Sequence, residues 1–158
     1  RFGGAEAYGV ALMRELSRQH DVTVIARRYD QPDLELPFQP VRVSRRWPSW
    51  VRVALFERRA RKLTQGRFDI VHSHVNGRCG DVEVIHVTPV RYNWRVRPLP
   101  WLKHALSYLS PRVQTYLHLE AGRVAARPGH RVVAVSLLTR EQLQAAYGRD
   151  QDLPGDFR

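Results

Sequence analysis

The beginning of the chain combines a helical pattern with a short apolar run. Residues 5–19 place four apolar side chains three or four positions apart, at Ala5, Tyr8, Leu12 and Leu16. Residues 22–26, Val-Thr-Val-Ile-Ala, are apolar without alternation. Continuous apolarity is typical of a strand that is buried on both faces of a parallel sheet. The pattern therefore predicts a helix followed by a buried strand.

Further along, the same two patterns alternate. We predict strands at 41–44, 68–75, 82–87 and 131–135, and helices at 49–64, 101–126 (interrupted near Pro111) and 137–147. Gly66 is expected to end the second helix and Ser136 to cap the last one. Three prolines predict a loop at 30–40. The polar residues 149–158 are expected to form a disordered tail.

This alternation indicates an α/β fold, a Rossmann-like, doubly wound parallel sheet. The 158 residues are enough for one domain with a real core. Gly3 and Gly4 feed a helix with no strand before them, whereas such glycine turns normally follow a buried strand. We therefore expect residues 1–148 to be one domain that lacks its first strand. Because that strand is central in doubly wound sheets, we also expect poor independent folding.

Charge adds a second feature. The chain holds 26 basic and 15 acidic residues, a net charge of +11. The segment 42–67 carries nine basic side chains, with Glu57 as its only acid. Such a surface can bind phosphates of nucleic acid, anionic lipid or a phosphorylated substrate, or simply be solvated. A non-enzymatic α/β module that binds anionic lipid or nucleic acid stays open as the alternative function, although no zinc spacing or RNA-binding aromatic signature supports nucleic acid.

The location of the protein is indicated by two simple observations. No apolar run approaches the ~20 residues that a membrane-spanning helix needs. The single Cys79 excludes an internal disulfide and fits a reducing compartment. We expect a cytoplasmic protein that can contact the inner face of an anionic membrane peripherally.

Several segments, in this order and spacing, resemble one family. They are Gly3-Gly4-Ala5-Glu6, His20-Asp21-Val22-Thr23-Val24, Phe68-Asp69-Ile70-Val71-His72-Ser73-His74, Val84-Ile85-His86-Val87-Thr88 and Val132-Val133-Ala134-Val135-Ser136 with Thr139-Arg140-Glu141. Together they resemble the N-terminal half of retaining GT-B glycosyltransferases of family 4. Bacterial mannosyl- and glucosyltransferases of lipopolysaccharide and glycolipid assembly belong to that family.

The resemblance implies an enzyme of two domains with its active site between them. The N-terminal domain would hold the glycan or glycolipid acceptor, and a C-terminal domain outside this sequence would hold the nucleotide-diphosphate sugar. The sugar would move to an acceptor hydroxyl with retention of configuration. Neither a cofactor nor a metal is expected, and the isolated chain is expected to be inactive.

The resemblance also assigns roles to particular residues. Gly3 and Gly4 would bind the donor, because a backbone without Cβ atoms can approach the diphosphate closely. His86 would be catalytic, through a hydrogen bond to the transferred sugar. Its position at the carboxyl end of a strand is where open α/β sheets bind ligands. The alternatives are an ordinary strand-to-helix turn for the glycines and a structural histidine for His86.

The acceptor candidates are less specific. They are His74 and Asn76 at one strand tip, and Tyr92, Trp94 and Arg95 in an aromatic and basic run. That run can hold an amphipathic acceptor or a lipid surface, or it can be ordinary helix packing with solvated arginines. His72 is interpreted as structural, because a metal site would need further ligands. Cys79 is expected to be unreactive.

Overall fold

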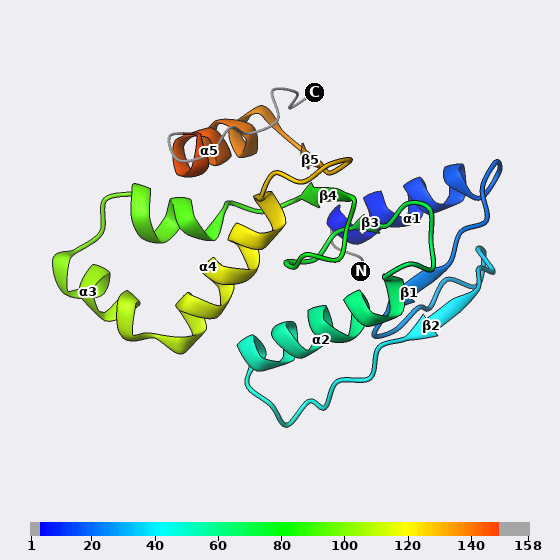
Figure 1. Ribbon diagram of the computed structural model, residues 1–158, viewed down its shortest axis with the longest axis horizontal. Helices are drawn as coiled ribbons and strands as arrows, with labels where there is room; N and C mark the ends of the chain where they lie inside the picture. The colour runs from blue at the N-terminus through cyan, green and yellow to red at the C-terminus, as the bar shows by residue number, and fades with distance from the viewer. Residues whose placement is uncertain (1–3, 149–158) are drawn as a thin grey trace. The chain divides into compact units, whose positions relative to one another are not determined.

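The computed structural model describes residues 4–148, which form two compact units, 4–46 and 47–148. The first unit contains α1 (Gly4–Leu16), β1 (Val24–Ala26) and β2 (Phe38–Pro40) (Figure 1). The second contains α2 (Ser49–Thr64), β3 (His72–Ser73), β4 (Val82–Ile85), the π-helical turn η1 (Tyr92–Val96), α3 (Trp101–Leu109), α4 (Pro111–Val124), β5 (Arg131–Ala134) and α5 (Leu137–Tyr147). The predicted mixed α/β class is confirmed.

The sheet of the first unit pairs β1 and β2 in parallel, with Val24 opposite Phe38. This corrects the prediction, which placed a loop at 30–40 and a strand at 41–44. The prolines do not prevent pairing, because Pro37 contributes only its carbonyl, which accepts from the Val24 N–H at 2.8 Å. The Val41 N–H then closes the ladder on the Ala26 carbonyl at 2.8 Å, so pairing ends where the strand was expected to begin.

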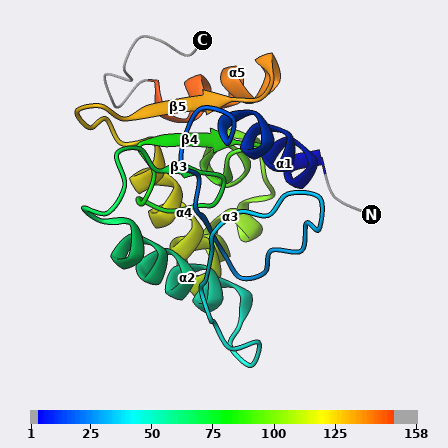
Figure 2. The ribbon, with the colours of Figure 1, turned by 90° about the vertical axis from the view of Figure 1, so that its right-hand side faces the viewer.

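The sheet of the second unit is parallel, in the order β3–β4–β5 (Figure 2). Its central strand, β4, pairs along its whole length with β5, from Val82 opposite Arg131 to Ile85 opposite Ala134. β3 is much shorter than the predicted 68–75. Directly before β3, the Asp81 carboxylate accepts from the Val71 N–H at 2.8 Å, and the Val71 carbonyl accepts from the Asp81 N–H at 2.8 Å. The strand predicted to run to Val87 ends at Ile85.

Helix ends in this unit follow the sequence signals. Gly66 has a φ of 67°, the left-handed conformation that terminates α2 without steric cost. Pro111 begins α4 immediately after Ser110, whose side chain accepts from the Val113 N–H. Ser136 caps α5 by accepting from the Thr139 N–H at 3.1 Å. The predicted break near Pro111 and the predicted cap at Ser136 are both confirmed.

The main core lies between α4, α5 and one face of the β4–β5 pair. It is built from apolar side chains that are almost completely buried, which are Ile85, Val124, Val132, Leu143, Ala146 and Tyr147. Tyr92 of η1 packs against this cluster. The core therefore fixes η1 and the end of β4 in relation to each other. The chain between them, and the loop between β3 and β4, carry the residues discussed next.

Candidate functional site

Three histidines meet at the carboxyl ends of β3 and β4. His72 belongs to β3, while His74 and His86 follow β3 and β4 directly. His72 Nδ1 lies 3.2 Å from His74 Nε2, and His74 Nδ1 lies 2.8 Å from His86 Nε2. The carboxyl ends of parallel strands share one edge of the sheet, which is why residues twelve positions apart come into contact. We call this group the imidazole chain.

Both ring nitrogens of His74 are used within the imidazole chain. A neutral imidazole has one N–H donor and one acceptor nitrogen, so His74 donates to one neighbour and accepts from the other. If it donates to His86, the proton of His86 is on Nδ1; if it accepts from His86, that proton is on Nε2. The direction in which the hydrogen bonds run along the imidazole chain therefore sets whether His86 Nδ1 is a donor or an acceptor.

The surroundings keep this group neutral. Burial, with smaller contributions from the neighbouring imidazoles and Arg123, lowers the pKa of His74 to about 4. The pKa values of His72 and His86 are also lowered, in both cases mainly by burial. Arg123 adds to the effect at His86. At neutral pH the imidazole chain therefore consists of three uncharged rings, which form hydrogen bonds without adding positive charge.

A buried ion pair supports the loop behind the imidazole chain. Arg123 of α4 and Glu83 of β4 are 3% and 0% exposed, with Nε 3.1 Å from Oε2. The same guanidinium donates to Asn76 Oδ1 at 2.9 Å and to the Val84 carbonyl. Arg123 thus joins α4 to β4 and to the loop that follows His74. Its role was not predicted from the sequence, although an acid within an otherwise apolar strand was a usable signal for Glu83.

Glu83 is nearly enclosed by its partners. Burial raises its pKa and Arg123 lowers it, and the net result is a pKa of about 7. Its other oxygen accepts from the Gly80 N–H at 3.0 Å. A Cβ added at Gly80 would lie 2.7 Å from both Glu83 Oε1 and the Ser73 Cβ. Glycine is needed there because the loop passes directly over the carboxylate.

A second buried carboxylate, Glu120 of α4, fixes the chain before η1. It accepts from the backbone N–H groups of Val90 and Arg91 at 2.5 and 2.8 Å. The Tyr147 hydroxyl of α5 donates to it at 2.8 Å. Burial raises the pKa of that Tyr147 hydroxyl. The segment that carries the predicted acceptor residues is therefore held by α4 and α5 together.

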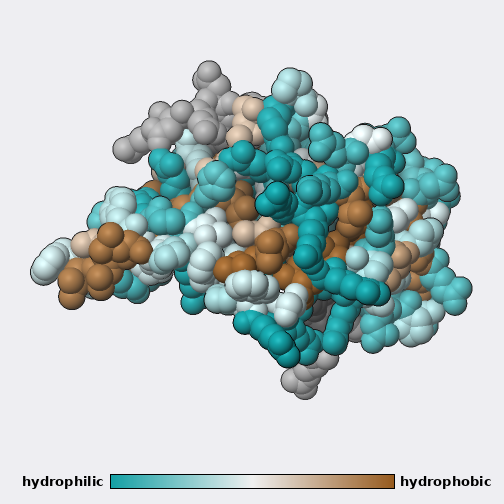
Figure 3. Space-filling view, turned by 60° about the horizontal axis from the view of Figure 1, so that its bottom comes forward, coloured by the Kyte–Doolittle hydropathy of each residue, from teal (hydrophilic) through white to brown (hydrophobic). Residues whose placement is uncertain are grey.

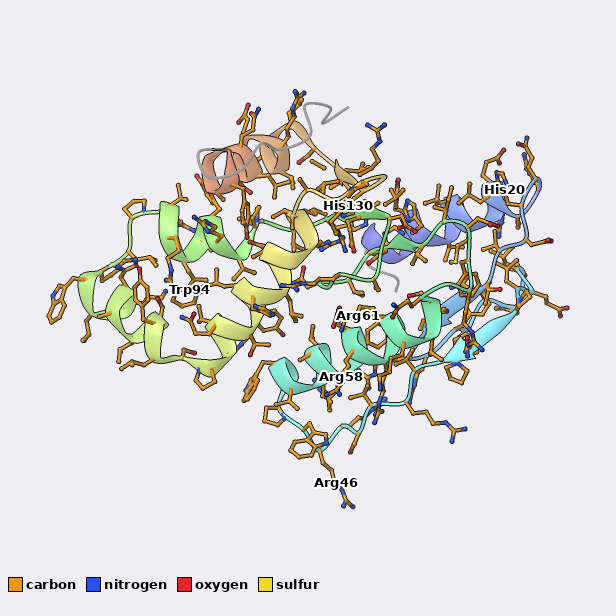
Figure 4. The ribbon with its side chains drawn as sticks, viewed as in Figure 1. His20, Arg46, Arg58, Arg61, Trp94 and His130 are labelled. Carbon is orange, nitrogen blue, oxygen red and sulfur yellow. The ribbon has the colours of Figure 1, made fainter. Side chains whose placement is uncertain are left out.

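The aromatic and basic acceptor candidates lie on η1. Tyr92 packs against the core, whereas Trp94 lies on the side of η1 that faces α3 and α4 (Figure 4). Arg95 Nη1 donates to Ser107 Oγ at 2.6 Å, and its guanidinium carbon lies 3.9 Å from the centre of the Tyr108 ring. A hollow of about 340 Å³ lies beside Trp94. Its lining is Asn93, Trp94, Arg97, Pro98, Leu99 and Lys103, so it contains none of the three histidines.

The remaining candidates divide as follows. His74 contacts His86, whereas the Asn76 side-chain oxygen accepts from Arg123. Gly4 is the first residue of α1, as the glycine-to-helix pattern predicted, and Gly3 lies outside the described residues, as does the tail 149–158. The donor, acceptor and catalytic roles of all these residues stay predictions.

Other chemistries find little support. Burial raises the pKa of Cys79 to about 11, which keeps it a thiol at neutral pH. Within residues 4–148, no group of three or more histidines, cysteines or acids is arranged to hold a metal ion. A search of the same residues finds no helix with the length and apolarity needed to cross a bilayer.

The basic segment 42–67 is divided between the two units. On α2, its exposed members include Arg58, Arg61 and Lys62 (Figure 4). The side chains of α2 that are fully buried are Glu57, Ala60 and Thr64, and Val51, Leu55 and Leu63, the expected inward face, are half-buried. The apolar pattern of α2 therefore did not identify its most buried positions.

Comparison with known proteins assigns the family. The family model described as Glycosyltransferase Family 4 matches residues 2–153, nearly the whole chain. The chain therefore belongs to glycosyltransferase family 4, and the parallel α/β architecture agrees with a Rossmann-like glycosyltransferase domain. Searches of the curated proteins and of the solved structures gave no match.

Proposed function

We propose that this domain serves a retaining glycosyltransferase, which moves a sugar from a nucleotide-diphosphate donor to an acceptor hydroxyl. The observation that carries the proposal is the imidazole chain at the carboxyl ends of β3 and β4. It occurs in a protein that belongs to glycosyltransferase family 4. In this proposal His86 forms a hydrogen bond to the transferred sugar. His74 positions His86, because its Nδ1 is 2.8 Å from His86 Nε2.

The electrostatics of the imidazole chain suit this chemistry. Glycosyl transfer builds positive charge on the anomeric carbon as the leaving group departs. An imidazolium beside that carbon would oppose the developing charge. Burial and Arg123 lower the pKa of His86, so that a neutral ring can bind a sugar hydroxyl without this penalty. The direction of the imidazole chain decides whether the ring donates to that hydroxyl or accepts from it.

The donor and acceptor are assigned to different segments. Gly3 and Gly4 would present backbone N–H groups and the amino end of α1 to the diphosphate. The leaving diphosphate would be stabilised by such N–H groups and by cationic side chains, without a required metal. Tyr92, Trp94 and Arg95 would contact the acceptor, a glycan or glycolipid.

Kinetics of the complete gene product test the role of His86. The change is His86→Ala, assayed for release of nucleoside diphosphate with a panel of nucleotide sugars. We expect kcat to fall by about a hundredfold or more, with a smaller change in KM, because the bond strengthens as charge develops. The matched control is His20→Ala, an exposed histidine of the other unit, which should stay within about twofold of the parent (Figure 4).

Two outcomes would contradict the proposal. Equal kcat values for the parent and the folded His86→Ala protein would make His86 structural. Absence of transfer from every nucleotide sugar, together with salt-dependent binding of anionic ligands through Arg45, Arg46, Arg58 and Arg59, would favour the alternative of a binding module.

A further inference from the structure

Helix α3 carries its apolar side chains on the outside. Trp101 and Leu109 are 80% and 81% exposed, whereas Ser107 is 2% exposed. The large apolar residues of α3 are all exposed, and they are Trp101, Leu102, Leu106, Tyr108 and Leu109. An amphipathic helix of a globular protein normally does the reverse and buries its apolar face. Figure 3 shows hydrophobic side chains gathered over α3, at the left of that view.

Polar contacts explain why α3 has this orientation. Ser107 Oγ accepts from Arg95 Nη1 at 2.6 Å and donates to the His104 carbonyl at 2.6 Å. The Ser107 carbonyl accepts from Gln114 Nε2 of α4 at 2.9 Å. These bonds fix the polar side of α3 against η1 and α4. The opposite, apolar side is consequently presented outward by a defined set of contacts.

The charge around α3 has one sign. Residues 84–119 contain five basic residues and no Asp or Glu, and the basic ones are Arg91, Arg95, Arg97, Lys103 and Arg112. Arg97, Lys103 and Arg112 are exposed. Apolar and aromatic side chains with a border of cations are the composition of helices that lie in the interface of anionic bilayers. Trp and Tyr are also the residues that favour the membrane–water boundary.

We propose that α3 docks this protein onto the surface of an anionic lipid bilayer. Trp101, Leu102, Leu106 and Leu109 would enter the boundary between headgroups and acyl chains. Arg97, Lys103 and Arg112 would contact the lipid phosphates. A second copy of the chain is a poorer occupant, because its own cationic border would face this one and repel it. Docking through α3 would not require sugar transfer.

Vesicle binding by the complete gene product, measured without any sugar donor, tests this docking. The vesicles are phosphatidylcholine alone, or phosphatidylcholine with about 30% phosphatidylglycerol. The variant is Trp101→Ser with Leu109→Ser, and we expect its affinity for the anionic vesicles to fall at least about tenfold. The matched control is Leu137→Ser with Leu138→Ser, which removes two exposed apolar residues from α5 and should change binding less than about twofold.

Charge variants locate the cationic contribution. Arg97→Gln, Lys103→Gln and Arg112→Gln together should abolish the preference for anionic vesicles and its salt dependence. The same three changes on α2, at Arg58, Arg61 and Lys62, should leave that preference in place. Loss of binding only in the α2 variant would overturn the proposal and assign the membrane contact to the basic segment.

Two further results would also overturn it. One is equal vesicle binding by the parent and the folded α3 apolar variant. The other is self-association of the parent without lipid, removed by the α3 changes in sedimentation measurements, which would identify a second copy as the occupant. Sugar transfer to a water-soluble acceptor should be unchanged in the Trp101→Ser, Leu109→Ser variant, so that failure here and failure of the proposed function are distinguishable.

Discussion

Helices α3 and α4 are neighbours in sequence, yet α4 buries its apolar side chains whereas α3 exposes them. α4 buries Val113, Leu119 and Val124 together with the charged Glu120 and Arg123. α3 buries only the polar Ser107 and exposes its leucines. Contacts with other segments therefore decide which side of a helix is buried. For α4 these are the core and two buried carboxylate networks, and for α3 they are Arg95 and Gln114.

The largest expected effect is loss of the charge that α4 buries. Arg123→Met leaves the Glu83 carboxylate at 0% exposure without its cationic partner. We expect a loss of about 3–5 kcal/mol in the free energy of unfolding. Urea unfolding measures it, with the exposed Arg112→Met on the same helix as the control. Adding Glu83→Gln should restore part of the loss, and a purely additive double variant would show that the pair is not coupled.

A smaller effect is expected when one leucine is removed from each helix. Leu119→Ala opens a cavity beneath α4 and should cost about 2–4 kcal/mol, because Leu119 is 6% exposed. Leu109→Ala on α3 should change the free energy of unfolding by less than about 0.5 kcal/mol. Thermal unfolding of both variants provides the measurement. Similar losses at the two sites would mean that the outward face of α3 is covered in solution.

The smallest expected effect is the change with pH in the free energy of unfolding that His74 and Glu83 contribute. The pKa of His74 is lowered to about 4 from an ordinary 6.5, so the folded protein binds fewer protons than the unfolded chain between these values. The stability that His74 contributes is present above pH 6.5 and is lost as the pH falls toward 4. Glu83, with its pKa raised from 4.5 to about 7, acts in the opposite sense, since its contribution is lost as the pH rises.

The variant His74→Asn separates these two contributions. Urea midpoints measured between pH 7.5 and 4.5 should fall less steeply for His74→Asn than for the parent. An identical slope in the two proteins would contradict a buried, neutral His74.

Much of the fold was predictable because its signals are local. The limits of α2 and α5 follow from Gly66 and Ser136, whose backbone and side-chain roles depend on adjacent residues. β2 was missed because three prolines in 30–40 suggest a loop, although Pro40 is the last residue of the strand, opposite Ala26, and the Pro37 carbonyl accepts from the Val24 N–H. The outward face of α3 could not be predicted, since the contact between Arg95 and Ser107 depends on a π-helical turn that no periodicity indicated.

The candidate site was predictable only in part. His86 and His74 were each selected from strand ends, but their contact requires the parallel pairing of β3 with β4. His72, interpreted as structural, contacts the same group through His74. Arg123 gave no signal, because an arginine in an Arg-rich chain does not stand out until its burial is known.

The configuration of the transferred sugar tests most sharply whether this domain serves a retaining glycosyltransferase. The complete gene product is incubated with an α-linked nucleotide-diphosphate sugar and an acceptor, and the anomeric proton of the product is observed by NMR. We predict an α-linked product that forms in the parent and is nearly absent with His86→Ala. A β-linked product, or equal formation of the product without His86, would contradict the account.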